Sequence, residues 1–482
     1  MSISIILTDA RASILLKLKL GILIILPVFV SCSPHAPHKN ITPLVTENAA
    51  YSLTSGGIQS QNRWWEALND PVMDSLIEEA LSANLTLKQI HARIEQTVAA
   101  DTQAASFMFP ELNAEASARK EWEADKKDDN TYNTSLTLAW EIDLWGRISS
   151  ERRAAMHDIM ATREELEAAA LILSAGVAET YVQIIEQELQ LLLLDQQIKA
   201  GETFLELIEL RFSYGEASVV DVYQQRQLLA STRSQVPVVK SLLRTLKNRL
   251  QVQLGRSPGN LDMNVANDFP KLPELPLTGI PVNLLQNRPD LRRIYNEMIA
   301  IDYRVAEAVA DRFPSIQLSG SAGFTDGFST SDRLITLLLQ AIVPVIDWDR
   351  RSSEVRKREA MFREELARYS ESYLVAIEEV ENALWQEKYQ LELLQALEDQ
   401  ASIARSNLNE TRNRYRQGLS DYLPVLTALQ SLQRLERDIL SGRRQLISIR
   451  ILLHRSLGGS RLMARTEPVE SGKANISERV VK

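Results

Sequence analysis

Residues 145–153 read WGRISSERR, and residues 348–356 read WDRRSSEVR. The two stretches have a tryptophan, two arginines, two serines and a glutamate in the same order and at the same spacing. The offset of 203 residues holds without a gap when 145–255 is aligned with 348–458. Self-similarity at a fixed offset is the signature of a repeated structural unit. The chain is therefore predicted to contain two copies of one unit.

Upstream of these stretches the offset becomes 204, because Phe109-Pro110 aligns with Phe313-Pro314. One residue was gained or lost between the two registers. Each copy is expected to begin with a helix, at about 71–107 in the first and 288–312 in the second. A proline stands near the start of each helix, where its missing N–H leaves no partner unsatisfied.

Each copy continues with a pair of segments that predict β-strands. Residues 111–123 and 132–142 alternate apolar and polar side chains with the period of two that is typical of a strand. The second pair lies at 315–346, and its return strand is more uniformly apolar. Strands of about ten residues cross a bilayer when they are tilted. The pattern alone is also compatible with an ordinary soluble sheet.

Each copy is predicted to end in a long helical hairpin. The first arms, 147–213 and 350–416, contain no proline, and at 1.5 Å per residue each would extend roughly 100 Å. Gly215 and Gly418 mark the turns, because glycine adopts the left-handed backbone that ends a helix tightly. The return arms repeat apolar residues at alternating steps of three and four, which predicts coiled-coil packing.

The N-terminus has the pattern of a secretory signal peptide followed by a lipidation site. Basic residues precede an apolar run, Leu20–Val30, which is too short to span a bilayer. The run ends in a stretch that resembles a lipobox, and Cys32 within it is the single cysteine of the chain. Cys32 is expected to be acylated and to anchor the protein to lipid. Phe29 stands where leucine is usual, so a signal peptide with an incidental cysteine is the alternative.

The predicted organisation therefore has five parts. A signal peptide at 1–31 and a lipid-anchored tether at 32–60 come first, and a flexible C-terminal tail at 461–482 comes last. Between them lies a first repeat at 61–260, with strands at about 111–142 and a helical hairpin at about 147–255. The second repeat follows at 261–460, with strands at about 315–346 and a helical hairpin at about 350–458.

The composition argues against several functions. The net charge of −9, without a basic tract, is unfavourable for binding nucleic acid. None of the five histidines lies four residues from another, so no metal site is expected. No nucleophile or phosphate-binding loop is recognisable, so neither an enzyme nor a cofactor is expected.

Four strands cannot close a barrel, and open sheet edges are not tolerated in lipid. If the strands lie in a membrane, several chains must therefore pool them. Twelve strands from three chains would leave an aqueous lumen. Pooling would also place the helical hairpins side by side, as the wall of a second tube.

With these features the chain resembles a known family, the outer membrane factors, which are TolC-like outer membrane efflux proteins. Within the family it is most similar to the lipid-anchored OprM-like, or NodT-type, subgroup of RND efflux systems. The resemblance covers about 60–460. Its most specific motifs are Trp140-Glu141-Ile142-Asp143-Leu144-Trp145-Gly146-Arg147 and the Arg-Pro-Asp element of Asn287-Arg288-Pro289-Asp290-Leu291. Phe313-Pro314 and Arg414-Tyr415 with Gly418 match as well, although a single glycine is a weak signal.

The resemblance implies a mainly α fold with a membrane β-barrel portion. Three chains would form a homotrimer with a twelve-stranded barrel and a twelve-helix periplasmic tunnel, in the outer membrane of a Gram-negative bacterium. The implied partners are outer-membrane lipid, a periplasmic adaptor (membrane fusion protein) and an inner-membrane RND transporter. The channel would conduct substrates passively and is not an enzyme.

Multidrug or xenobiotic efflux is the expected use of such a channel, and metal efflux or type I protein secretion are the alternatives. The rival class is a lipid-anchored periplasmic coiled-coil adaptor or scaffold. An adaptor of that kind would not need amphipathic strands beside its long hairpin.

The resemblance also implies two sets of site residues. The hairpin tips match family positions that dock the adaptor, namely Arg211, Gly215, Val219, Val220, Arg414, Gly418, Tyr422 and Leu423. After the second tip, many OprM-like members have an Asp-Ala-x-Arg gate, but here the stretch reads Thr427-Ala428-Leu429-Gln430. Either closure uses the neutral hydrogen bonds of Thr427 and Gln430 with Asp221, Asp421 or nearby arginines, or the channel closes more weakly.

Overall fold

The computed structural model describes residues 34–38, 41–45, 50–53, 63–121, 129–259, 268–325 and 333–458. The expected signal peptide, Cys32 and the tail at 461–482 lie outside these described residues. The chain divides into two compact units. The first comprises Met1–Leu44, Arg93–Arg163 and Arg293–Ser370, and the second Val45–Ala92, Glu164–Arg292 and Glu371–Lys482.

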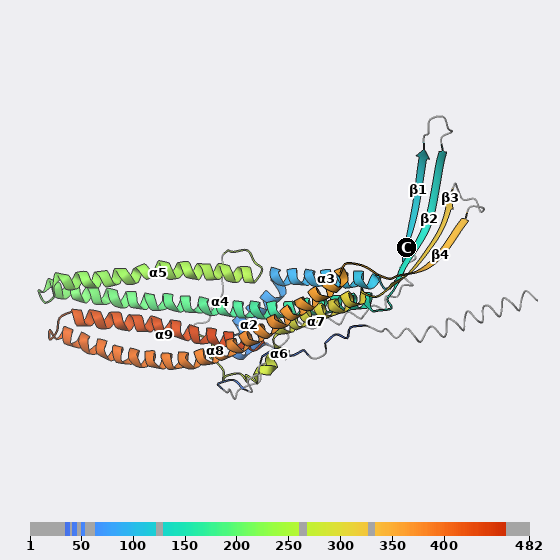
Figure 1. Ribbon diagram of the computed structural model, residues 1–482. Helices are drawn as coiled ribbons and strands as arrows, with labels where there is room; N and C mark the ends of the chain where they lie inside the picture. Colours follow the sequence, from blue (N-terminus) through green and yellow to red (C-terminus); the bar gives the residue numbers. More distant parts are fainter. Residues whose placement is uncertain are drawn as a thin grey trace, which may run out of the picture. The chain divides into compact units, whose positions relative to one another are not determined.

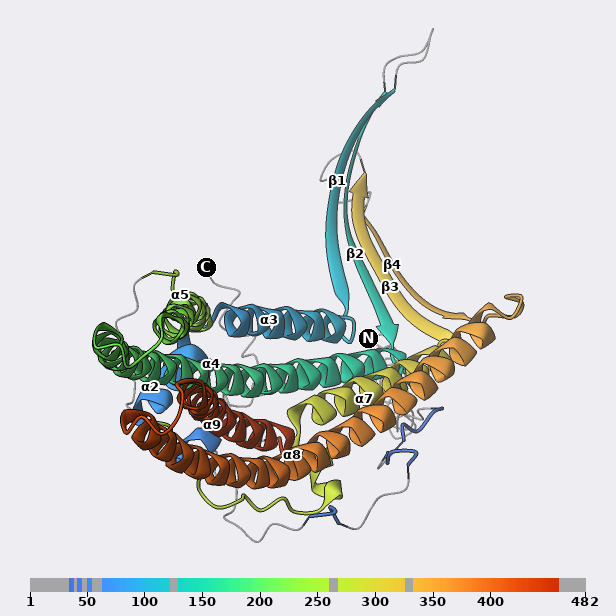
Figure 2. The ribbon, with the colours of Figure 1, turned by 90° about the vertical axis from the view of Figure 1, so that its left-hand side faces the viewer.

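The first unit contains one antiparallel sheet of four strands (Figures 1 and 2). The strands follow one another in sequence order, so β2 of the first copy pairs with β3 of the second copy, with Leu138 opposite Gly320. Strands β1 and β4 are consequently the two edges of the sheet. The bounds are β1 Glu111–Glu121, β2 Asp129–Ile142, β3 Ser315–Thr325 and β4 Arg333–Ile342.

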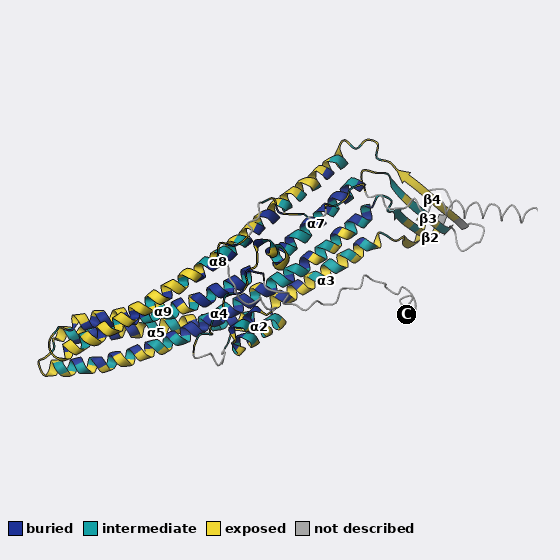
Figure 3. Ribbon diagram, turned by 90° about the horizontal axis from the view of Figure 1, so that it is seen from below, coloured by how far each residue is buried: buried dark blue, intermediate teal, exposed yellow. Residues whose placement is uncertain are grey.

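Strand β4 is apolar and exposed on both faces. Leu337, Leu338 and Leu339 are consecutive and therefore alternate between the faces, yet they are 75%, 50% and 66% exposed. Figure 3 shows β4 in the colour of exposed residues. The strand ends at Ile342 rather than at the predicted position 346, and Pro344 follows, which cannot donate a ladder hydrogen bond. A large exposed apolar surface of this kind marks a site that another chain or a membrane covers.

The helix expected at 71–107 is divided in two by Asn84. Helix α2 spans Pro71–Ala83 and α3 spans Leu85–Ser106. Asn84 has a ψ of 133°, outside the helical region, and its side-chain oxygen accepts hydrogen bonds from the N–H groups of Thr86 at 2.8 Å and Leu87 at 3.3 Å. The residue thus caps the start of α3. In the second copy, α6 (Leu284–Asn287) follows η3 (Pro281–Asn283), and α7 spans Pro289–Ala310.

Two helical hairpins follow the two strand pairs. The first consists of α4 (Arg147–Ser213) and α5 (Val219–Gln253), and the second of α8 (Arg350–Arg416) and α9 (Leu423–Ser456). Helices α4 and α8 have 67 residues each and begin and end at repeat-equivalent positions. In the second unit the four helices run side by side (Figures 1 and 2).

The core of the second unit is built around two neighbouring tryptophans. Trp64 and Trp65 lie in the short helix η2 (Trp64–Leu68) and are 1% exposed, and Trp64 donates to Ser174 Oγ at 3.2 Å. Tyr181 of α4 donates to the carboxylate of Asp70 at 3.1 Å, while Asp70 also accepts from the N–H groups at the start of α2. One carboxylate therefore caps α2 and ties it to α4.

A stretch of α4 is long and apolar enough to cross a membrane, and α4 is the one such helix in the described parts of the chain. Most of that stretch, 61%, is buried within the protein. Helix α4 also contributes fully buried residues such as Tyr181 and Ile185 to the core. Packing against α2, α5 and α9 is therefore sufficient to explain its apolar composition.

Candidate functional site

The two hairpin tips have the same backbone turn. Gly215 and Gly418 have φ angles of +76° and +71°, and the N–H of the next residue bonds back to the carbonyl oxygen of Arg211 or Arg414 at 2.9 Å. This 6→1 bond defines the Schellman ending of a helix, for which glycine is favoured. The predicted turn glycines therefore lie where the backbone requires them.

Arg211 joins the first tip to the second. Its guanidinium donates to the carbonyl oxygens of Tyr415 at 2.8 Å and Arg416 at 3.2 Å, and lies 4.7 Å from the centre of the Tyr415 ring. The side chain of Arg211 is only 14% exposed. Its repeat equivalent, Arg414, is exposed. The two predicted docking arginines thus have different surroundings: Arg211 holds the tips together and Arg414 faces outward.

Tyr422 was expected to contact an adaptor, but its side chain is completely buried. It packs against Phe204 and Tyr415, with ring centres 5.9 and 5.7 Å away, and its hydroxyl donates to Gln225 Oε1. Burial raises the pKa of Tyr422, and the neighbouring Tyr415 and Asp221 raise it further. Tyr422 can therefore support a docking surface only indirectly, by fixing the second tip on the first.

The exposed part of the tips includes several apolar side chains. Val219 and Val220 are 44% and 54% exposed on the first tip, and Leu423 is 59% exposed on the second. Gly215 and Gly418 are exposed as well. Further exposed apolar residues at the tips are Phe212, Tyr214, Tyr223 and Leu419. Figure 3 shows exposed residues at the ends of these helices.

The residues predicted for the gate fall into two groups: those whose side chains form hydrogen bonds within their own chain segment, and those whose side chains are exposed and not used in helix capping. Asp221 accepts a hydrogen bond from the backbone N–H of Ser218 at 3.1 Å and forms a capping box at the start of α5. The Thr427 hydroxyl donates to the carbonyl oxygen of Leu423 at 3.0 Å, within its own helix. Asp421 and Gln430 are exposed, and no side chain caps the start of α9. Asp421 and Gln430 therefore remain accessible for contacts with another chain.

Phe204 and Gln225 were not predicted from the sequence, although both join the tips. Phe204 lies beneath Tyr415 and Tyr422, and the Gln225 amide donates to the carbonyl oxygen of Gly201 at 2.8 Å. Phe204 precedes Arg211 by seven residues, which is the heptad spacing that places two residues on one helix face. That spacing could have identified Phe204, whereas Gln225 has no comparable signal.

A mostly helical chain with two long hairpins and a strand pair in each half has the architecture of an outer-membrane channel subunit. The family model described as "Outer membrane efflux protein" matches residues 76–256 and 280–459, one match for each copy. The chain belongs to the outer membrane efflux protein family and is an outer-membrane efflux channel protein.

Individual relatives agree with this assignment. The chain is 30% identical over 433 residues to the "Toluene efflux pump outer membrane protein TtgF" of Pseudomonas putida, covering 86% of this chain and 90% of the relative. It is 27% identical to "Nodulation protein T" of Rhizobium leguminosarum bv. trifolii, covering 81% of this chain and 86% of the relative. The solved structure of "the outer-membrane channel OprN" matches with a TM-score of 0.82 at 26% identity, covering 90% of this chain and 100% of that one.

Proposed function

We propose that three copies of this chain form a channel with a twelve-stranded barrel in the outer membrane and a twelve-helix tunnel in the periplasm. The observation that supports this most directly is the exposed apolar edge strand β4. A four-stranded sheet with two open edges is unfavourable in lipid, because unpaired backbone groups have no water to bond. Pairing β4 of one chain with β1 of the next removes every edge when three chains close the ring.

The assembly can be tested on protein extracted from outer-membrane fractions with detergent. Cross-linking and light scattering should give a particle of three chains, and heating should dissociate it. A chain that remains monomeric and soluble without detergent, after removal of residues 1–32, would support the adaptor or scaffold alternative instead.

The channel is proposed to act with a periplasmic adaptor and an inner-membrane RND transporter, which supplies the energy. The exposed tip residues Val219, Val220 and Leu423, the tip glycines and Arg414 would contact the adaptor, while Arg211 and Tyr422 would hold the tips in place. Val220→Asp together with Leu423→Asp should abolish export, because charged groups would have to be desolvated at the interface. The variant should still assemble, since both side chains are exposed in the subunit.

The substrates are proposed to be organic toxicants and drugs, in line with the relative named as a toluene efflux pump component. Deletion of the gene followed by a susceptibility panel distinguishes the uses. Greater sensitivity to solvents, dyes and antibiotics supports multidrug efflux. Greater sensitivity to metal ions alone would indicate metal efflux, and a missing secreted protein would indicate type I secretion.

The gate is proposed to lie at Asp421, Thr427 and Gln430 of neighbouring chains, with Asp221 committed to capping α5. Without a charge pair, closure would depend on neutral and single-charge hydrogen bonds. Asp421→Ala combined with Gln430→Ala should raise the conductance of single channels in planar bilayers. An unchanged conductance would place the constriction elsewhere along the tunnel.

The lipid anchor at Cys32 is also part of this proposal. Labelling with a palmitate analogue should mark the wild-type chain and leave Cys32→Ser unlabelled. If the wild-type chain takes up no palmitate analogue, Cys32 is not acylated and the signal-peptide alternative holds.

A further inference from the structure

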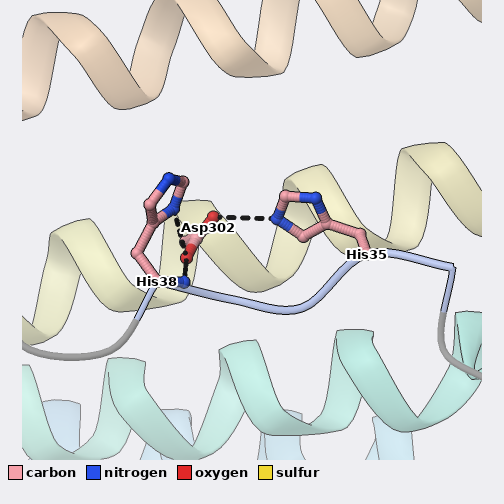
Figure 4. A group of neighbouring side chains, drawn as sticks. All are labelled: His35, His38 and Asp302. Atoms are coloured by element: carbon pink, nitrogen blue, oxygen red, sulfur yellow. Dashed lines mark hydrogen bonds and ion pairs between the residues drawn. The ribbon is translucent and has the colours of Figure 1, made fainter.

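Two histidines near the N-terminus face one buried carboxylate in the first unit. His35 Nε2 lies 3.2 Å from Asp302 Oδ1, and His38 Nδ1 lies 3.1 Å from Asp302 Oδ2. The three groups can each present one ligand atom within 4.8 Å of the others. Figure 4 shows both imidazole rings on either side of the Asp302 carboxylate, which is borne by α7.

Local structure orients this cluster. The backbone N–H of His38 donates to Asp302 Oδ2 at 2.5 Å, and the His38 ring stacks on Phe362 of α8 with ring centres 4.9 Å apart. Each histidine follows a proline, Pro34 or Pro37, which restricts the backbone of this segment. The His38 ring is therefore held in place by more than its contact with the carboxylate.

The first copy of the repeat has no carboxylate at the position that corresponds to Asp302. Asp302 is 1% exposed, and the register that aligns Phe109-Pro110 with Phe313-Pro314 places Val98 at the equivalent position of the first copy. A buried carboxylate is unfavourable unless it is paired or binds a metal ion. An apolar residue suits this helix position in the first copy, so Asp302 needs an explanation specific to the second copy.

We propose that His35 Nε2, His38 Nδ1 and the Asp302 carboxylate bind one Zn²⁺ ion. Zinc takes nitrogen and oxygen ligands at 2.0–2.1 Å in tetrahedral geometry, which separates neighbouring ligand atoms by about 3.3 Å. His35 Nε2 lies 3.2 Å from Asp302 Oδ1 and His38 Nδ1 lies 3.1 Å from Asp302 Oδ2, so each nitrogen is at about this separation from one carboxylate oxygen. One of these two oxygens would be the third ligand atom, and the three ligand atoms lie within 4.8 Å of one another. Three protein ligands leave the fourth position to water. The ion would fasten the segment that follows Cys32 to α7 and so fix where the lipid-anchored tether begins.

This site is independent of what the channel exports. Its histidines were not expected to bind metal, because they are three residues apart in a segment without helical periodicity. The third ligand comes from a residue 264 positions beyond His38. Only the fold brings the three together.

The test uses the full mature protein in detergent, purified through an affinity tag that contains no histidine. After treatment with EDTA and dialysis, Zn²⁺ is titrated in competition with a chromophoric chelator, and Co²⁺ is titrated to record its visible absorption. The variants are His35→Gln with His38→Gln, Asp302→Asn, and the control His91→Gln, which removes an exposed histidine of α3. The double histidine variant alters only the terminal segment, so it tests the site even if Asp302→Asn impairs folding.

Wild type and His91→Gln should bind one Zn²⁺ per chain and give the intense visible bands of four-coordinate Co²⁺. The double histidine variant and Asp302→Asn should each bind at least about tenfold more weakly. If wild type binds Zn²⁺ no more tightly than the double histidine variant, the histidines only form hydrogen bonds with Asp302 and the proposal is wrong.

Discussion

At the scale of single residues, Arg211 is the clearest determinant of the tip structure. Arg211→Ala would remove its hydrogen bonds to the carbonyl oxygens of Tyr415 and Arg416 and its contact with the Tyr415 ring. We expect a loss of about 2 kcal/mol in the local stability of the tips, because hydrogen bonds from charged groups contribute that much.

Hydrogen exchange of the amides around Gly215 and Gly418 measures the local stability of the tips. Arg414→Ala is the matched control, since Arg414 is the repeat equivalent and is exposed. If these amides are equally protected from exchange in Arg211→Ala and Arg414→Ala, Arg211 does not hold the tips together.

His454 gives the second unit a pH dependence. The side chain is buried against Trp64, with ring centres 5.5 Å apart, and burial with the nearby Arg450 lowers its pKa from 6.5 to about 4. Between pH 4 and pH 6.5, His454 therefore binds a proton in the unfolded chain but not in the folded chain. Stability is therefore complete above about pH 6.5 and falls by roughly 3 kcal/mol as the pH is lowered to 4.

Unfolding in urea at pH 7 and pH 4.5 measures this change in the free energy of unfolding. His454→Phe keeps an aromatic ring beside Trp64 and removes the titratable group, so its loss of stability over the same interval should be smaller. A wild-type and a variant protein with the same pH dependence would exclude His454 as the cause.

The sequence was sufficient for the tip residues that the backbone itself constrains. Gly215 and Gly418 could be predicted because only a few residue types adopt a positive φ, and both have one. The burial of Tyr422 could not be predicted, since it depends on Phe204 and Gln225 from the other hairpin. A pattern within one helix does not specify which neighbouring helix covers it.

At the scale of elements, Asn84 determines where α2 ends and α3 begins. Asn84→Ala would leave two N–H groups of α3 without their cap and remove the hydrogen bond to the carbonyl oxygen of Gln253 at 2.8 Å. We expect a loss of about 1–2 kcal/mol in the free energy of unfolding. Ser82→Ala is a suitable control, because the exposed Ser82 hydroxyl donates to the carbonyl oxygen of Glu79 in its own helix at 2.8 Å.

Chemical denaturation monitored by circular dichroism compares the two variants. If Asn84→Ala unfolds at the same denaturant concentration as Ser82→Ala, then α2 and α3 do not depend on the cap.

The long helices were easier to predict than their neighbours. Helices α4 and α8 cover the same residues as the two proline-free stretches, because nothing in 147–213 or 350–416 interrupts helical hydrogen bonding. The break at Asn84 is not predictable from the sequence, since asparagine is tolerated within a helix and its capping role depends on the non-helical backbone that it adopts here. The shorter β4 follows from Pro344, which cannot donate a hydrogen bond to the ladder.

At the scale of the whole molecule, the duplication has a consequence for assembly. Within one chain, Trp145 donates to the carbonyl oxygen of Pro314 at 2.8 Å and stacks on Phe313, with ring centres 5.0 Å apart. This contact accompanies the pairing of β2 with β3. The repeat equivalents are Trp348 and Phe109-Pro110, and in the subunit Trp348 is 93% exposed and Phe109 is 66% exposed. If β4 pairs with β1 of the next chain, Trp348 should reach Phe109 and Pro110 of that chain.

Replacing Trp145 and Trp348 in turn tests whether the contact within one chain has an equivalent between neighbouring chains. Trp348→Ala should leave the fold of the subunit unchanged and lower the temperature at which the proposed trimer dissociates in detergent, because the contact it removes lies between chains. Trp145→Ala should instead lower the stability of the subunit, since the equivalent contact lies within it. A photo-cross-linking amino acid at position 348 should attach to the peptide containing Phe109 of another chain, as identified by mass spectrometry. Cross-links confined to a single chain, with no change in dissociation temperature for Trp348→Ala, would mean that β4 and β1 of neighbouring chains do not meet.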